Sequence, residues 1–233
     1  MPKAPAETRP EWPALPFALP KPGPGRRERA TRLLAALDRA YPDAACRLDW
    51  STPHELLVAT ILSAQATDES VNAATPALFR RFPTPAALAG AGADEIAPCI
   101  RTIGLWRNKA RAVEESMRAL VERHGGEVPR DMDALLALRG VARKTANVVL
   151  GTAFGIASGV TVDTHAFRVT QRWGWHAERT AEKVEPILMK AVPQAGWPDF
   201  GHRVVLFGRY TCTARAPKCA GCALAGLCPS VMG

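Results

Sequence analysis

The chain has 233 residues, of which 30 are Lys or Arg and 22 are Asp or Glu, so its formal net charge is +8. Hydrophobic residues make up 47% and charged residues 22%, which excludes a largely disordered chain and allows one large domain or two small ones. The positive balance favours an anionic partner, with nucleic acid ahead of an acidic membrane surface.

No segment of the sequence fits a membrane span or a secretion signal. The longest stretch without a charged residue, 146–162, is slightly short for a bilayer and contains Asn147, Ser158 and three glycines. Residues 1–25 carry eight of the twenty prolines, which predicts a disordered Pro-rich tail instead of a signal peptide. We therefore expect a cytoplasmic protein that does not bind membranes.

Apolar spacing and capping residues predict helices along most of the remaining chain. Thr52, Pro53 and Glu55 form the start signal of one helix, and Gly125–Gly126 ends another. Convincing alternation of apolar and polar residues is absent, so the sequence predicts an all-α fold. The expected helices span residues 26–40, 53–62, 68–81, 85–90, 94–100, 107–124, 131–138, 144–155, 164–173, 180–192 and 199–210.

Four cysteines near the end of the sequence have the spacing of a metal centre, C-x6-C-x2-C-x5-C. They are Cys212, Cys219, Cys222 and Cys228. Thiolates so close in sequence bind either zinc or an iron–sulfur cluster, and the presence of only one CxxC pair favours the cluster. The loop after Cys212 carries Arg215 and Lys218, which either contact a phosphate backbone or are simply solvated.

A tight turn between the helices expected at 131–138 and 144–155 is a candidate phosphate site. Backbone N–H groups at the start of a helix bind phosphate independently of base sequence. A nucleotide-binding loop of the Walker A type is excluded, because Arg143 occupies one of its glycine positions. The candidate contacts in this turn are Arg139, Gly140, Val141, Ala142 and Arg143.

Lys144 and Asp163 are candidate catalytic residues, and both have ordinary alternatives. Lys144 lies in the first turn of a helix, where the helix dipole favours a partly neutral amine that can attack a sugar C1′ and form a Schiff base. A surface contact to phosphate would also explain it. Asp163 precedes the next helix and is either an N-cap alone or a carboxylate that stabilises positive charge on a sugar.

Five segments together resemble the endonuclease III family of DNA glycosylases, and they occur in family order. The resemblance implies two helical lobes with a DNA groove between them. One lobe, residues 46–157, is expected to be a six-helix barrel that contains a helix–hairpin–helix at about 131–155. The other lobe, residues 26–45 plus 158–233, is expected to hold a [4Fe-4S] cluster in the loop 212–228. The five segments are the hairpin at 138–146, residues 162–165, the four cysteines, and residues 63–68 and 102–105.

The resemblance also implies roles for single residues. Lys144 matches the nucleophile, Asp163 the catalytic carboxylate, and the four cysteines the cluster ligands. Gln65 matches a residue that fills the gap left by an extruded nucleotide, and Leu105 matches a wedge that enters the base stack. Without the resemblance, these two would be interpreted as a helix C-terminal Gln and a core Leu. His165 matches a residue at the DNA-facing start of a helix.

The lysine distinguishes the branch of the family that both excises a base and cuts the strand. The resemblance therefore implies an enzyme that removes oxidised pyrimidines from double-stranded DNA, forms an imine at C1′, and cleaves at the abasic site by β-elimination. We expect a bacterial, nucleoid-associated monomer. Two alternatives come from other classes: a DNA module that binds damage with little turnover, and a zinc-binding helical regulator.

Two positions depart from the usual Leu-Pro-Gly-Val-Gly hairpin of the family. Arg139 replaces the proline and Ala142 replaces the second glycine. If position 142 required a positive φ, alanine would cost about 1 kcal/mol or more, and its Cβ would also obstruct a phosphate. These changes predict weaker DNA binding with intact chemistry, and they motivate the alternative of a binding module.

Overall fold

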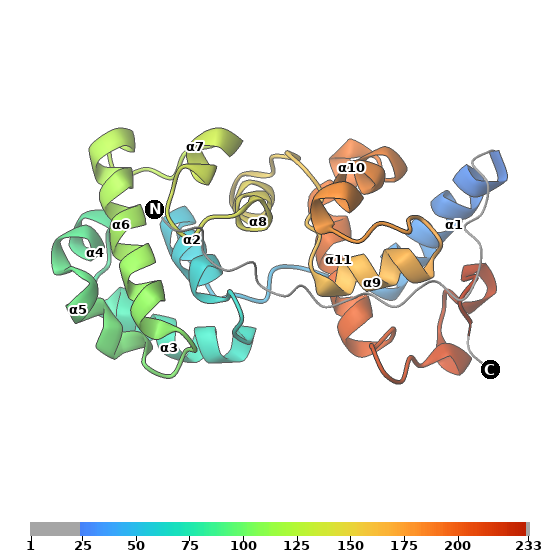
Figure 1. The fold of residues 1–233 in the computed structure, drawn as a ribbon, viewed down its shortest axis with the longest axis horizontal. Helices are drawn as coiled ribbons and strands as arrows, with labels where there is room; N and C mark the ends of the chain where they lie inside the picture. Colours follow the sequence, from blue (N-terminus) through green and yellow to red (C-terminus); the bar gives the residue numbers. More distant parts are fainter. Residues whose placement is uncertain (1–23, 232–233) are drawn as a thin grey trace. The chain divides into compact units, whose positions relative to one another are not determined.

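The computed structural model describes residues 24–231, and within this range every regular element is a helix (Figure 1). The predicted tail lies almost entirely outside the described residues. None of the described helices is both long and apolar enough to cross a membrane. The α-helices are α1 (Pro24–Ala40), α2 (Pro53–Leu62), α3 (Asp68–Arg81), α4 (Pro85–Ala91), α5 (Ala93–Ile96), α6 (Trp106–His124), α7 (Met132–Leu136), α8 (Arg143–Phe154), α9 (Thr164–Arg172), α10 (Ala181–Ala191) and α11 (Trp197–Tyr210).

The prediction of an all-α fold is confirmed, and each expected helix is present with boundaries shifted by a few residues. One expected helix, 94–100, is divided into the short α5 and a 3-10 helix, η1 (Ala97–Ile100). Pro98 lies at the start of η1 and has no N–H to donate to an α-helical bond. Three further 3-10 turns are η2 (Gln194–Gly196), η3 (Cys219–Gly221) and η4 (Ala225–Leu227).

Side-chain caps explain why several helices begin where they do. The predicted start signal of α2 is confirmed, because Thr52 Oγ1 accepts a hydrogen bond from the Glu55 N–H and Glu55 Oε2 accepts one from the Ser51 N–H at 2.6 Å. Hydroxyl or carboxylate oxygens likewise accept N–H groups at the starts of α3, α4, α7 and α9. Most of α2 is buried, and it is a central helix of its unit.

The described chain divides into two compact units. Unit 1 contains residues 24–42, 162–192 and 203–231, and unit 2 contains residues 43–161 and 193–202. The predicted boundaries place residues 193–202 in the cluster lobe. In the structure, the contacts of these residues group them with unit 2. The start of α11 packs closely on α8 there, since a Cβ built on Gly151 would lie 3.0 Å from Pro198 Cβ. Residues 43–45 and 158–161 also group with unit 2.

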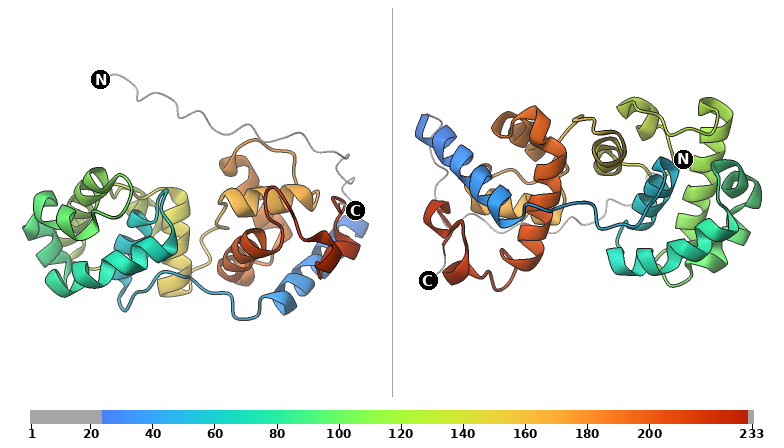
Figure 2. Two further views of the ribbon diagram at one scale, coloured as in Figure 1. Left: turned by 90° about the horizontal axis from the view of Figure 1, so that it is seen from below. Right: turned by 180° about the vertical axis from the view of Figure 1, so that it is seen from behind.

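Each unit has its own apolar core. In unit 2, α2 packs with α8 and α6, and α4 packs along α6. In unit 1, the core includes Trp173 and Phe207, whose ring centroids lie 5.8 Å apart, with Leu33 and Leu37 of α1 also fully buried. Figure 2 shows α1 alongside the C-terminal cysteine-rich segment, and α1 contacts η4 of that segment.

Candidate functional site

The turn between α7 and α8 is a rigid hairpin. Leu138 and Val141 are buried, and the Val141 N–H donates to the Leu138 carbonyl at 3.2 Å. Gly140 has φ +79°, and a Cβ there would lie 3.1 Å from Ala112 Cβ and 3.3 Å from Ile61 Cγ2. Only glycine both adopts this positive φ without strain and lacks the Cβ that would crowd Ala112 and Ile61. Buried anchors thus leave the intervening backbone exposed at the surface.

Ala142 corrects one expectation about this hairpin. Its φ is −95° and its ψ is 170°, so its backbone is extended and any residue can adopt it. The strain expected from alanine at this position is therefore absent. Ala142 is the N-cap of α8 and supplies no side-chain cap, which leaves the first turn of this helix open to an external anion.

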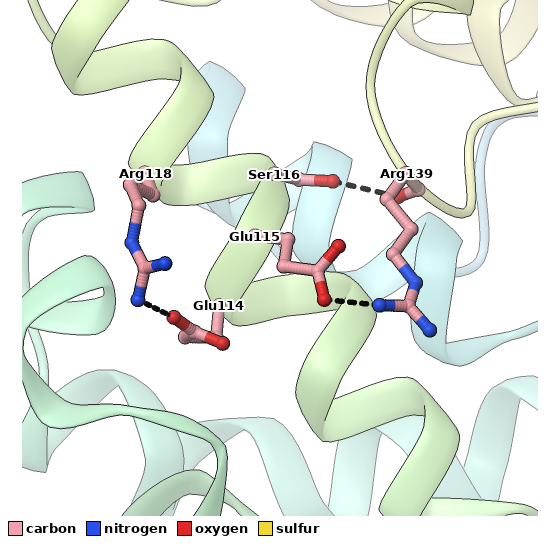
Figure 3. Close-up of polar contacts among 5 residues, drawn as sticks. All are labelled: Glu114, Glu115, Ser116, Arg118 and Arg139. Carbon is pink, nitrogen blue, oxygen red and sulfur yellow. Dashed lines mark hydrogen bonds and ion pairs between the residues drawn. The ribbon is translucent and has the colours of Figure 1, made fainter.

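Arg139 ties the hairpin to α6 (Figure 3). The Ser116 hydroxyl donates to the Arg139 carbonyl at 2.6 Å, and the Arg139 guanidinium forms an ion pair with Glu115. Both ionic side chains are about half exposed, so the ion pair contributes at most about 1 kcal/mol to stability. Another anion can therefore replace Glu115 as the partner of the Arg139 guanidinium. Nearby on α6, Arg118 pairs with Glu114 and has no part in the hairpin.

Lys144 is exposed in the first turn of α8, directly after the hairpin. No acidic residue of unit 2 forms an ion pair with it. Arg143, directly before it, and Gly140, four residues before it, are also exposed, whereas Val141 is buried and anchors the turn. The hairpin therefore presents an accessible amine beside a helix N-terminus that can hold phosphate.

Gln65 and Leu105 are the only non-glycine residues of the described range with a positive φ, at 53° and 60°. Such a backbone costs on the order of 1–2 kcal/mol for a residue with a side chain. Both are exposed, and Leu105 retains 59% of its surface, so the interpretation of Leu105 as a core residue is wrong. Gln65 lies beyond the end of α2, and the two turns are neighbours, since a Cβ on Gly104 would lie 4.0 Å from the Gln65 carbonyl oxygen.

In unit 1, Asp163 is the N-cap of α9. Its Oδ1 accepts the Ala166 N–H at 2.7 Å, and the side chain is half-buried. The capping role is thus present, but it uses only one of the two carboxylate oxygens. His165 follows on the first turn of α9, with its Nδ1 3.2 Å from Arg168 Nη2. A Cβ on Gly208 of α11 would lie 2.8 Å from His165 Cβ, so this glycine allows the two helices to pack closely.

The four cysteines line one hollow, together with apolar walls from Trp173, Phe207 and Leu224. Burial raises the pKa of the Cys222 and Cys228 thiols. Among residues 24–231, no three His, Cys, Asp or Glu side chains converge tightly enough to hold a single metal ion. Polar groups also reach the cysteine sulfurs, because Arg172 Nη1 donates to Cys212 Sγ at 3.3 Å and the Leu224 N–H donates to Cys222 Sγ at 3.4 Å.

Two arginines on α9 that were not predicted as site residues hold the cysteine loop. Arg168 Nη2 donates to the carbonyls of Gly208 and Cys212 at 2.8 and 3.1 Å. Arg172 donates to the carbonyls of Thr213 and Ala214 at 2.7 and 2.8 Å. The two arginines are four residues apart and so lie on one face of α9. This spacing is visible in the sequence and could have indicated a shared role. Arg215 and Lys218, the candidate phosphate contacts predicted from the sequence, are exposed on this loop.

The chain is similar to known proteins over most of its length. Residues 58–194 match the HhH-GPD superfamily of base excision DNA repair proteins. Endonuclease III of Synechocystis sp. is 51% identical, over 88% of this chain and 94% of its own. A solved non-covalent endonuclease III–DNA complex matches with a TM-score of 0.83 and 42% identity, covering 88% of this chain and 95% of that one. A trapped covalent endonuclease III–DNA intermediate matches with the same score and identity, covering 88% and 96%.

Proposed function

Because the chain belongs to the endonuclease III family within the HhH-GPD superfamily of base excision DNA repair proteins, we propose that it is a DNA glycosylase with lyase activity. One observation carries the proposal: Lys144 is an exposed amine in the first turn of α8, immediately after a hairpin suited to phosphate. The covalent endonuclease III–DNA intermediate of a relative 42% identical in sequence supports an enzyme of this class. Duplex DNA is the partner.

The chemistry follows from an amine held beside a damaged nucleotide. Lys144 Nζ attacks C1′, the bond from C1′ to the base breaks, and the base leaves with the bonding electrons and takes up a proton. Loss of a proton from nitrogen and opening of the sugar ring give an imine. Removal of a C2′ proton then expels the 3′ phosphate by β-elimination, and water releases the lysine. The Asp163 carboxylate is assigned the stabilisation of the positive charge that develops on the sugar.

Gln65 and Leu105 prepare the duplex for this reaction. A nucleotide turned out of the helix leaves an unstacked gap that costs a few kcal/mol. The exposed Leu105 side chain enters the stack as an apolar wedge, and the Gln65 amide fills the gap left by the extruded nucleotide. Their positive φ values support this assignment, because strained residues that persist on an exposed turn are concentrated at functional sites.

The cysteine-lined hollow fits a [4Fe-4S] cluster. Four thiols that line one hollow with apolar walls are donors suited to an iron–sulfur cluster, and the spacing with only one CxxC pair favours the cluster over zinc. When bound, the cluster holds the loop 212–228 in place by cross-linking the four cysteines. An assay of iron and sulfide in the purified protein tests this. Brown protein with iron is expected, and colourless protein with a single zinc would contradict it.

Oxidised pyrimidines and abasic sites are the proposed substrates. The enzyme is proposed to act as a monomer in the bacterial cytoplasm, where the nucleoid DNA lies. The departures in the hairpin do not favour a module that binds without turnover. Ala142 has an unstrained backbone, and the Arg139 ion pair is weak enough to be exchanged for a phosphate. Arg143, His165, Arg215 and Lys218 are further proposed DNA contacts.

Incision of a duplex with one thymine glycol tests the proposal. The native protein is expected to cut the strand at the lesion. Asp163→Asn should slow the cutting about 10²- to 10⁴-fold, because it removes a charge but retains an oxygen able to cap α9. Asp43→Asn, on the exposed loop after α1, is the control for a lost carboxylate and should cut normally. DNA binding by the native protein without any incision would contradict the enzyme proposal.

A further inference from the structure

A pocket beside the turn that presents Leu105 contains three arginines. It has a volume of about 220 Å³, room for several waters or one phosphate group, and α5, η1 and the start of α6 form its walls. Arg101, Arg107 and Arg111 line it, with Trp106 and Asp94. Trp106 directly follows Leu105 in the chain, so the pocket adjoins the proposed wedge.

The indole ring of Trp106 fixes two of these arginines. Trp106 is half-buried and packs on the core of unit 2, which makes it a firm platform. The guanidinium carbon of Arg107 lies 3.9 Å from the ring centroid and that of Arg101 lies 5.9 Å from it. Both distances are within the range of cation–π attraction. Arg111 is four residues after Arg107 on α6 and therefore lies on the same face of the helix.

The arginines of this pocket outnumber its acidic residues by three to one. Within residues 24–231, none of the three arginine side chains donates a hydrogen bond or forms an ion pair, although Arg81 and Arg139 of the same unit each pair with a glutamate. Asp94 is the single acidic residue in the lining. Three guanidinium groups around one small pocket produce a positive potential, and their planar N–H groups match the oxygens of a phosphate.

We propose that this arginine pocket binds a backbone phosphate of the DNA duplex, next to the point where Leu105 enters the base stack. The inference rests on the DNA-binding function proposed above. A wedge that separates two bases needs the flanking backbone held in register, and contacts to phosphate supply this positioning without reading sequence. The pocket would therefore add affinity for any duplex sequence around the lesion.

The salt dependence of binding tests the proposal. The variant Arg107→Gln/Arg111→Gln and the charge-matched control Arg80→Gln/Arg123→Gln, whose arginines are exposed outside the pocket, are compared on a duplex with a stable abasic-site analogue. Between about 50 and 200 mM salt, the slope of log affinity against log salt should fall by about 1 to 2 for the pocket variant. Affinity should fall about tenfold. An equal change in the control variant would overturn the proposal.

Neutral methylphosphonates placed singly around the lesion locate the contact. The native protein should lose affinity at one or two positions, and the pocket variant should lose nothing further at those same positions. Additive losses at every position would contradict the assignment. Inorganic phosphate should compete with DNA for the native protein more than for the pocket variant, once ionic strength is matched. Failure of the proposed function is distinguished separately, because incision of the thymine glycol duplex by the native protein tests it without any pocket variant.

Discussion

At the scale of single residues, two positions of the hairpin, 140 and 142, differ in whether their backbone and surroundings require glycine. Gly140 combines a positive φ with close contacts to Ala112 and Ile61, so it has no substitute. Ala142 has an extended backbone on the surface, so the glycine usual in the family is not needed for its conformation. Glycine is therefore required by the structure at position 140 but not at position 142.

This contrast gives a matched pair of variants. Gly140→Ala should lower the free energy of unfolding by about 2–3 kcal/mol, because it adds a strained φ and a methyl group in contact with the core. Ala142→Gly should change it by no more than about 1 kcal/mol. Urea unfolding of both variants measures this. Equal destabilisation by the two changes would contradict the account.

Ala142→Gly should also leave the affinity for a duplex with an abasic-site analogue within about threefold of the native value. The backbone already has the conformation that the hairpin uses, so glycine relieves no strain. Fluorescence anisotropy on labelled duplex measures the affinity. A large gain would mean that the Cβ of Ala142 does obstruct a phosphate.

His176 connects stability to pH. Burial lowers its pKa to about 4, and its Nε2 lies 3.2 Å from the Phe167 carbonyl, to which the neutral ring donates. In the unfolded chain the imidazole binds a proton below about pH 6.5, but in the folded protein it does so only near pH 4. Stability from this group is therefore complete above pH 6.5 and is lost as the pH falls toward 4.

His176→Gln should reduce this part of the pH dependence. Between about pH 6.5 and 4, the native free energy of unfolding should fall by up to about 3 kcal/mol more than that of the variant. Denaturant unfolding at several pH values measures both slopes, so a general destabilisation by the substitution does not affect the comparison. Parallel slopes would show that His176 contributes nothing to acid sensitivity.

At the scale of elements, α9 links the proposed catalytic carboxylate to the cysteine loop. Asp163 caps the first turn of α9, and Arg172 at its other end bonds to the carbonyls of Thr213 and Ala214 and to Cys212 Sγ. Arg168, between them, bonds to the end of α11 and to Cys212. A loop that buries little of its own surface is thus held by one helix face as well as by its cysteines.

Arg172→Gln should weaken this attachment without preventing the fold. Loss of the carbonyl bonds leaves the loop more mobile, so we expect the visible absorbance of the cluster to decay several-fold faster in air. Arg179→Gln, an exposed arginine of the same unit, is the control. Equal decay of the native protein and both variants would contradict the role of Arg172 in the loop.

At the scale of the whole molecule, local signals predicted the helices because caps and apolar faces are encoded over a few residues. Thr52 and Glu55 mark the start of α2, and Pro98 breaks the helix expected at 94–100. The division into units depends on contacts between distant residues, such as Gly151 with Pro198, which no local pattern reveals. The sequence also does not predict the positive φ of Gln65 and Leu105, because neither residue type favours the left-handed backbone conformation.

The roles of Lys144, Asp163, Gln65 and Leu105 came from the family resemblance, since the residues alone left ordinary alternatives open. The structure removes the alternative of a core Leu at position 105. Asp163 retains both interpretations, because an N-cap uses only one carboxylate oxygen. The arginine pocket required the fold, because the turn before α6 and the first turns of α6 bring Arg101, Arg107 and Arg111 together around Trp106.

Reductive trapping shows whether Lys144 forms a covalent imine with DNA. Native protein and Lys144→Gln are incubated with borohydride and a duplex with an abasic site or a thymine glycol. We expect a stable covalent adduct with the native protein on both duplexes and none with the variant. An adduct of undiminished yield with Lys144→Gln, or no adduct with native protein that still binds the duplex, would contradict this expectation.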